Sequence, residues 1–209
     1  EAVQAGVTIE KIFALESYRD QLAAFPQTVW VSEEILRDLA DTQTPQGIVA
    51  VIQKEEMGQP DLRQGKFLFL EDVQDPGNVG TMIRTADAAG FTGVIVSDKS
   101  ADIYSLKTLR SMQGSHFHLP IYRMPLATFV EGAKKSDLPI LATTLSRDSK
   151  DYRKLSPLEN FALVMGNEGQ GISPVMAESA DQLVHIGMKG RAESLNVAIA
   201  AGILMFYFS

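Results

Sequence analysis

The chain has 209 residues, of which 45% are hydrophobic and 22% are charged, and it contains no cysteine. This composition is typical of a globular protein of one or two domains and excludes a disordered or fibrous chain. Without cysteine there is no disulfide framework, thiolate nucleophile or cysteine-bound metal, which fits a reducing cytosol. No signal peptide opens the chain, and the longest apolar stretch, residues 195–208, is shorter than the roughly 20 residues that span a bilayer. We therefore expect a cytoplasmic protein with no membrane partner.

The net charge of −7 is carried by the first part of the chain. Residues 1–62 contain four basic and eleven acidic side chains, whereas the remainder contains 15 of each. Phosphate binding needs Lys and Arg, and the second part has a basic cluster within residues 147–154. Such a cluster, taken alone, is more often a solvated loop. Charge therefore neither establishes nor excludes an RNA partner.

The first segment alternates short β-rich runs with helical stretches. Ser32 is the predicted N-cap of a helix over residues 33–40. The chain opens inside a predicted helix that ends at Gly6, which indicates that residues are missing upstream. The β-rich runs are residues 11–15, 28–31 and 47–53.

A polar stretch at residues 54–64 follows this segment. It contains Gly58 and Pro60 and is typical of a linker. We therefore predict two domains, residues 1–62 and residues 63–209.

Six apolar runs alternate with helical patterns in the second segment. The runs are continuous rather than alternating, which indicates an α/β domain with a parallel sheet covered on both faces. Ligands bind such sheets beyond the carboxyl ends of the strands, so the loops after the runs are the informative places. The predicted strands are residues 66–70, 93–97, 116–119, 139–143, 161–165 and 183–186.

The first informative loop is EDVQDPGN, residues 71–78. The letters DPG predict a tight turn, and Asn78 is the predicted N-cap of the helix that follows. Arg84 lies inside this helix, next to its apolar stripe. Considered alone, Arg84 is most simply an exposed partner of Asp87.

The second loop is GNEGQG, residues 166–171, whose glycines let a ligand approach the backbone closely. It is not a dinucleotide fingerprint, because Pro174 occupies the place of the third glycine, and it is not a P-loop, because GK[ST] is absent. Ser173 and Pro174 predict the start of a helix. Glu168 can be a general base, an amide-binding group or a turn residue.

The third loop, residues 187–193, precedes a strongly apolar helix. Ser194 is its predicted N-cap, and Asn196 near its start needs a hydrogen-bond partner. Considered alone, this pattern describes a capped core helix.

Taken together, the three loops resemble the motifs of the SpoU/TrmH branch of the SPOUT RNA methyltransferases. The motifs are DPGNVGTMIRTA at residues 75–86, GNEGQG at residues 166–171, and IGM leading to SLNVA at residues 186–198. In this order and spacing they are highly specific. Residues 1–62 resemble the small α/β, ribosomal-protein-like RNA-recruiting domain that precedes the catalytic domain in many members.

The resemblance implies a parallel-sheet α/β trefoil-knot fold, S-adenosylmethionine as methyl donor, and a homodimer through the knotted region. It implies methyl transfer to a ribose 2′-hydroxyl of structured RNA, with rRNA favoured over tRNA because a recruiting domain is present. No metal is required. One departure is Gly187, where a proline is usual; it implies a looser cofactor loop.

The resemblance also assigns residues. Because a guanidinium is effectively never deprotonated in proteins, Arg84 more easily holds the target phosphate or stabilises a developing alkoxide than acts as a base. His116 and His118 are interpreted as structural. The residues assigned to catalysis are Arg84, Asn78, Glu168, Ser194 and Asn196, and those assigned to cofactor binding are Thr143, Gly166, Gly171, Ile186, Met188 and Leu195.

Two other functions stay open. A non-catalytic RNA-binding or assembly factor with the same fold is disfavoured by the intact catalytic set. An unrelated nucleotide-binding enzyme such as a dehydrogenase is disfavoured by the failed glycine fingerprint. The acidity of residues 1–62 is awkward for an RNA-recruiting domain, and we expect either upstream residues or a small patch around Arg19 or Arg37 to supply the phosphate contacts.

Overall fold

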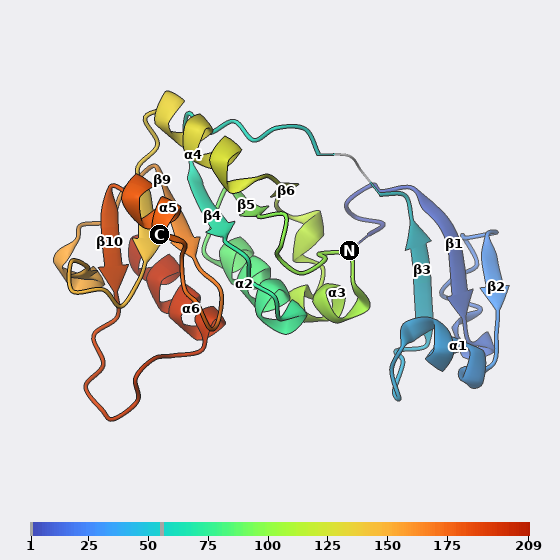
Figure 1. Cartoon of the computed structure of the whole chain (residues 1–209). Helices are drawn as coiled ribbons and strands as arrows, with labels where there is room; N and C mark the ends of the chain where they lie inside the picture. Colours follow the sequence, from blue (N-terminus) through green and yellow to red (C-terminus); the bar gives the residue numbers. More distant parts are fainter. Residues whose placement is uncertain (1, 55–56) are drawn as a thin grey trace. The chain divides into compact units, whose positions relative to one another are not determined.

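A computed structural model describes residues 2–54 and 57–209 (Figure 1). The chain falls into two compact units, Glu1–Glu56 and Met57–Ser209. Leu62, in the stretch predicted as a linker, is buried in the core of the second unit. Within the described residues, no helix combines the length and the apolar character that crossing a membrane requires.

The first unit is built on a three-stranded sheet in the order β2-β1-β3. Strand β1 (Ile9–Ala14) runs parallel to β2 (Thr28–Trp30) and antiparallel to β3 (Ile48–Ile52). A 3-10 helix, η1 (Glu16–Tyr18), follows β1.

Helix α1 (Glu33–Ala40) begins as predicted, because the Ser32 hydroxyl accepts a hydrogen bond from the N–H of Ile35. The helix predicted to end at Gly6 is wrong. Residues 2–6 form a turn instead, with Gly6 at a φ of 72° and its N–H donating to the carbonyl of Val3. A single closed turn leaves too few hydrogen bonds to propagate a helix.

The second unit is built on a seven-stranded sheet in the order β6-β5-β4-β9-β7-β10-β8. Every neighbouring pair runs parallel, which confirms the prediction from the continuous apolar runs. The strands are β4 (Lys66–Leu70), β5 (Gly93–Val96), β6 (Ile121–Arg123), β7 (Ile140–Thr143), β8 (Lys150–Asp151), β9 (Phe161–Met165) and β10 (Gln182–His185).

The strand predicted at residues 116–119 is wrong. Ser115–Phe117 forms a 3-10 helix, η2, and strand β6 begins only at Ile121. Gln113 and Gly114 both have positive φ, so the chain turns sharply just before residues 116–119. The residues that follow the turn are helical rather than extended. Periodicity alone does not distinguish a short apolar strand from a short helical segment.

Helices cover both faces of this sheet, as Figure 1 shows. Helices α2 (Pro76–Ala88) and α6 (Val197–Phe208) pack on the face that carries Leu68 and Leu70. Helices α4 (Leu126–Lys135) and α5 (Pro174–Ser179) pack on the opposite face, where Phe69 stacks on Phe129 with ring centroids 4.2 Å apart. The remaining helix, α3 (Leu106–Met112), packs against α2. The carboxyl ends of the strands are thereby left for the connecting loops.

Candidate functional site

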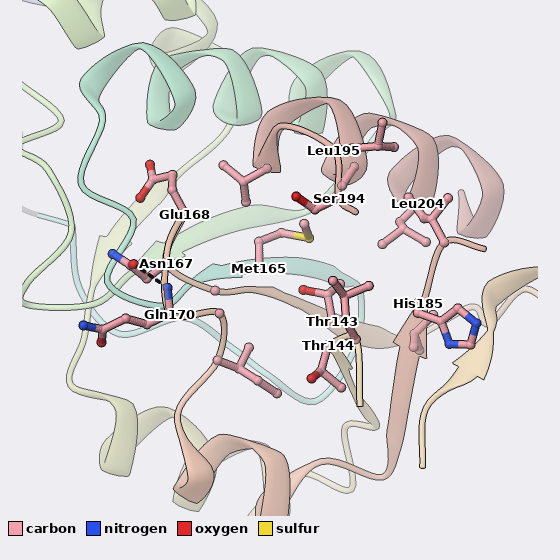
Figure 2. Close-up of a pocket in the computed structure, with 18 of the residues that line it drawn as sticks. Thr143, Thr144, Met165, Asn167, Glu168, Gln170, His185, Ser194, Leu195 and Leu204 are labelled. Carbon is pink, nitrogen blue, oxygen red and sulfur yellow. Dashed lines mark hydrogen bonds between the residues drawn. The ribbon is translucent and has the colours of Figure 1, made fainter. Parts of the chain in front are cut away.

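A cavity of about 530 Å³ lies at the carboxyl ends of β7, β9 and β10 (Figure 2). This is the edge of a parallel sheet at which ligands bind. Three segments line it: residues 143–146 after β7, residues 165–172 after β9, and parts of residues 184–204 from β10 through α6. All six residues assigned to cofactor binding line this cavity: Thr143, Gly166, Gly171, Ile186, Met188 and Leu195.

The glycine-rich loop after β9 is held in a tight turn by Asn167. The backbone N–H of Asn167 donates to the carbonyl of Gly171 at 3.0 Å, and the reverse bond is 2.9 Å long. The side-chain oxygen of Asn167 accepts the N–H groups of Gly169 at 2.9 Å and Gln170 at 3.0 Å. Its amide donates to the carbonyl of Asp72 at 2.8 Å, which ties the loop to the end of β4.

Asn167 is absent from the residues assigned by sequence. The available signal was an asparagine at the start of a glycine-rich turn, because Asn side chains accept hydrogen bonds from backbone N–H groups two and three residues on. The turn also explains Gly166. A Cβ there would collide with the backbone of Gly171 and Ile172.

Glu168 binds the start of α2. Its carboxylate accepts the backbone N–H of Gln74 at 3.2 Å and of Asp75 at 3.1 Å, and the side-chain amide of Asn78 at 3.1 Å. Burial raises the pKa of Glu168, but these hydrogen bonds outweigh it and lower the pKa below its usual value. A carboxylate that is ionised and has amide donors on both oxygens is a poor general base at neutral pH. Of the three roles open to Glu168, the geometry favours the amide-binding one.

The predicted N-cap at Asn78 is wrong. The N-cap of helix α2 is Asp75, three residues earlier, whose carboxylate accepts the N–H of Asn78 at 2.9 Å. Lys107 of α3 pairs with the same carboxylate at 2.9 Å, and these bonds lower the pKa of Asp75 below its usual value. The side chain of Asn78 is therefore left for tertiary contacts.

The predicted N-cap at Ser194 is also wrong, because α6 begins two residues later. The side-chain oxygen of Asn196 accepts the N–H groups of Ala198 at 2.9 Å and Ile199 at 3.3 Å. The Asn196 amide donates to the side-chain oxygen of Asn78 at 3.0 Å, which is the partner that its position required. A chain of side chains, Glu168–Asn78–Asn196, therefore joins all three loops.

Ser194 lines the cavity and is exposed. Figure 2 shows it beside Leu195, on the α6 side of the pocket, with Glu168 on the opposite side. Within the described residues, its hydroxyl makes no hydrogen bond to the protein. The hydroxyl is therefore available to a ligand.

Arg84 lies between one and two turns beyond Asn78 on α2 and does not line the cavity. Its side chain is exposed and makes no ion pair or hydrogen bond with any described residue. The pairing of Arg84 with Asp87 is wrong, because Asp87 contacts His118 at 2.8 Å instead. A guanidinium with no partner among the described residues is available to bind an external anion.

The cavity fits S-adenosylmethionine. Its volume lies within the roughly 300–1,000 Å³ of small-molecule pockets. Met165, Ile186 and Leu195 give it apolar walls, and Gly171, at a φ of 71°, borders open space in which no atom lies within 4 Å of its missing Cβ. Apolar walls suit an adenine ring, and exposed loop backbone suits its polar edges. No group of three or more metal-ligating side chains is found among the described residues.

Comparisons with known proteins point to one family. The family model described as SpoU rRNA Methylase matches residues 65–206, and the model described as RNA 2′-O ribose methyltransferase substrate binding matches residues 1–58. The 23S rRNA (guanosine(2553)-2′-O)-methyltransferase RlmP of Bacillus subtilis (strain 168) is 39% identical over 209 residues, which are 99% of this chain and 83% of RlmP.

Solved structures of the same kind match nearly the whole chain. The AdoMet-bound rRNA methyltransferase from Sinorhizobium meliloti superposes with a TM-score of 0.87 at 33% identity, over 99% of this chain and 81% of that one. The SpoU methyltransferase AviRb from Streptomyces viridochromogenes, in complex with AdoMet, gives 0.84 at 29% identity, over 99% of this chain and 84% of that one.

Proposed function

The chain belongs to the SpoU family of RNA methyltransferases, and from this premise we propose that it methylates a ribose 2′-hydroxyl of 23S ribosomal RNA at the cavity described above. The family reaction is methyl transfer from S-adenosylmethionine to the ribose 2′-oxygen of RNA. The observation that carries the proposal is that the second and third motif loops line one cavity, and that the Glu168–Asn78–Asn196 chain joins the first motif loop to both of them.

The cavity residues bind the cofactor and exclude water from it. S-adenosylmethionine supplies, when bound, a methyl group already activated by its attachment to a sulfonium. Ile186, Met188 and Leu195 provide apolar walls, and Gly166 and Gly171 expose backbone groups. Because the methyl is already activated, the protein has to place the acceptor oxygen and manage its proton.

Arg84 and Ser194 act on the RNA. The O–CH₃ bond at the ribose forms as the bond between that methyl group and the sulfonium sulfur breaks. The proton of the 2′-hydroxyl passes to solvent, and negative charge develops on the 2′-oxygen as the proton leaves. Arg84, which has no partner within the described chain, binds the phosphate of the target nucleotide or stabilises that charge. The hydroxyl of Ser194, at the edge of the cavity, orients the ribose through a hydrogen bond.

Glu168, Asn78 and Asn196 position these groups without reacting. Glu168 fixes the glycine-rich loop against the start of α2, and Asn196 fixes the start of α6 to the same point. Arg84 on α2 and Ser194 before α6 are thereby held at set positions relative to the cavity.

The match to RlmP across both units supports ribosomal RNA as the substrate and a cytoplasmic location. Mapping 2′-O-methylation in total RNA, from cells with and without the gene, tests this. We expect one 23S rRNA position to lose its methyl group in the deletion strain and to regain it with the wild-type gene but not with Arg84→Ala.

Two other outcomes would redirect the function. Loss of a methyl group from tRNA alone would favour the tRNA alternative. An unchanged methylation map, together with a ribosome assembly defect that Arg84→Ala complements, would favour a non-catalytic assembly factor.

We also propose that a second copy of the chain covers the outer face of α6. This helix is apolar on all sides, although it packs on the core through only one face. Ile199 is 57% exposed and Phe206 is 59% exposed on the outer side. Helices that are hydrophobic all round are normally buried, and a self-complementary patch is typical of two-fold dimers.

Replacing Phe206 with aspartate is expected to convert a dimer into a monomer, because two carboxylates would be buried in the interface. Light scattering coupled to size exclusion measures the change in mass. Val175→Asp on α5 is a matched control, since Val175 is 57% exposed, close to the 59% of Phe206. A dimer that survives in the Phe206 variant, or a wild-type monomer, would contradict the proposed interface.

A further inference from the structure

Strand β8, at one edge of the large sheet, borders the segment that leads into the third loop. Strand β8 has two residues and pairs in parallel with β10, so that Asp151 lies opposite His185. Residues 186–188 follow β10 directly, and Ile186 and Met188 line the cavity. The side chain of Asp151 therefore stands next to the point at which this segment leaves the sheet.

Arg153 holds the Asp151 carboxylate in one orientation. The guanidinium donates to it through Nε at 2.9 Å and Nη2 at 2.6 Å, and the backbone N–H of Arg153 donates at 3.0 Å. The Asp151 side chain is only 15% exposed. These hydrogen bonds from Arg153 also hold the pKa of Asp151 well below its usual value, so the carboxylate is charged at neutral pH.

The Asp151–Arg153 pair lies against the backbone of Gly187. A Cβ at Gly187 would lie 2.9 Å from Oδ2 of Asp151 and 3.6 Å from Nη2 of Arg153. Any side chain at position 187 would therefore displace either the loop or the carboxylate. Moving the carboxylate disturbs its three hydrogen bonds from Arg153.

The pair is in turn fixed to the core. Tyr152, between its two members, packs edge-to-face on Tyr207 of α6 with ring centroids 4.8 Å apart. The hydroxyl of Tyr207 donates to the carbonyl of Leu155 at 3.0 Å. Residues 151–155 are thus anchored on both sides of Arg153, and these contacts hold the Asp151 carboxylate against Gly187.

We propose that Asp151 and Arg153 are positioning residues that set residues 186–188 for cofactor binding, and that position 187 is glycine because this pair occupies the space of a side chain. The inference rests on the proposed binding of S-adenosylmethionine by Ile186 and Met188. It replaces the expectation that Gly187 loosens the loop. The contact with the Asp151–Arg153 ion pair restricts the loop here, in place of the ring of a proline at position 187.

The test is calorimetric titration of the 209-residue chain with S-adenosylmethionine. Gly187→Ala is expected to weaken binding about tenfold, which corresponds to about 1.4 kcal/mol, because the added methyl pushes the loop from the carboxylate. Asp151→Ala is expected to weaken binding several-fold, because residues 186–188 lose the carboxylate that packs against Gly187. In the double variant, Gly187→Ala with Asp151→Ala, the added methyl group occupies the space that the carboxylate has left. The fold-loss of affinity in the double variant should therefore be smaller than the product of the fold-losses in the two single variants.

The chain contains a matched control for the ion pair itself. Asp61 and Arg63 form the same arrangement two residues apart, with bonds of 2.8 Å from Nε and 2.6 Å from Nη2, and neither lines the cavity. Asp61→Ala should leave the affinity unchanged. Arg153→Lys, which keeps the charge and loses the planar fork, should weaken binding without affecting the fold.

Hydrogen exchange without ligand gives a readout independent of affinity. The amides of residues 186–188 should exchange faster in Asp151→Ala than in the wild type, with no such change in Asp61→Ala. Wild-type affinity in Gly187→Ala, or losses that multiply in the double variant, would overturn the positioning role. Failure of the wild type to bind S-adenosylmethionine would instead overturn the proposed cofactor site.

Discussion

Replacing Arg84 with alanine is expected to abolish most methyl transfer while leaving the affinity for S-adenosylmethionine near that of the wild type. The side chain is exposed, has no partner within the described chain, and lies outside the cavity lining, so its removal disturbs neither the fold nor the cofactor site. We expect kcat to fall by about 10²–10³-fold, as when a donor to a developing oxyanion is removed. Single-turnover methyl transfer to the cognate RNA, with calorimetry of cofactor binding, measures both quantities.

Lysine should not restore the activity of Arg84→Ala. A guanidinium binds a phosphate through two parallel N–H groups, which the point charge of lysine does not reproduce. Arg63→Ala removes an exposed arginine from the same unit and serves as the control. Wild-type turnover in Arg84→Ala would show that the role is wrongly assigned, and full activity in Arg84→Lys would reduce that role to simple charge.

The second large effect is expected for Gly166→Ala. The new methyl group would collide with backbone atoms of Gly171 and Ile172, which a rotamer change does not relieve. Overpacking of this kind costs about 1–3 kcal/mol of unfolding free energy or more, and separating the two ends of the turn would break the paired bonds between Asn167 and Gly171. Urea unfolding and cofactor titration should show lower stability and lost binding together.

Substitutions at two neighbouring glycines distinguish a steric collision from backbone strain as the cause of this effect. At Gly169 the nearest atom to an added Cβ is the Asn167 side-chain oxygen, 3.7 Å away, so Gly169→Ala should unfold like the wild type. Gly171 has open space but a φ of 71°, so Gly171→Ala should lose about 1 kcal/mol through backbone strain alone. Equal effects at all three positions would refute the steric explanation.

The fold of the second unit was predictable because its central strands are buried on both faces. A strand covered by helices on each side has no polar face, so β4 and β9 appear in the sequence as unbroken apolar runs. Strand β8 was not predictable, since two residues carry no pattern and its pairing with β10 depends on tertiary contacts. The strand prediction for residues 116–119 failed because the conformation of this segment is decided by the turn at Gln113 and Gly114 rather than by its apolar side chains.

The loops of the candidate site were predictable, but the use of each side chain was not. Asp75 and Asn78 are both good capping residues, as are Ser194 and Asn196. The choice is made by partners that are distant in sequence: Glu168 engages the amide of Asn78, and Asn78 engages the amide of Asn196. No local rule contains these contacts.

The same hydrogen-bond chain determines when the site can form during folding. Asn78 and Asn196 are separated by 118 positions along the chain, and Glu168 is separated from Asn78 by 90. Closing such long loops costs entropy that only the completed contacts repay, so these bonds form late. During synthesis, α2 leaves the ribosome long before its partners exist. The cofactor cavity is therefore among the last features to be completed. While Asn196 is still inside the ribosome, the nascent chain can form most of the sheet but not the site.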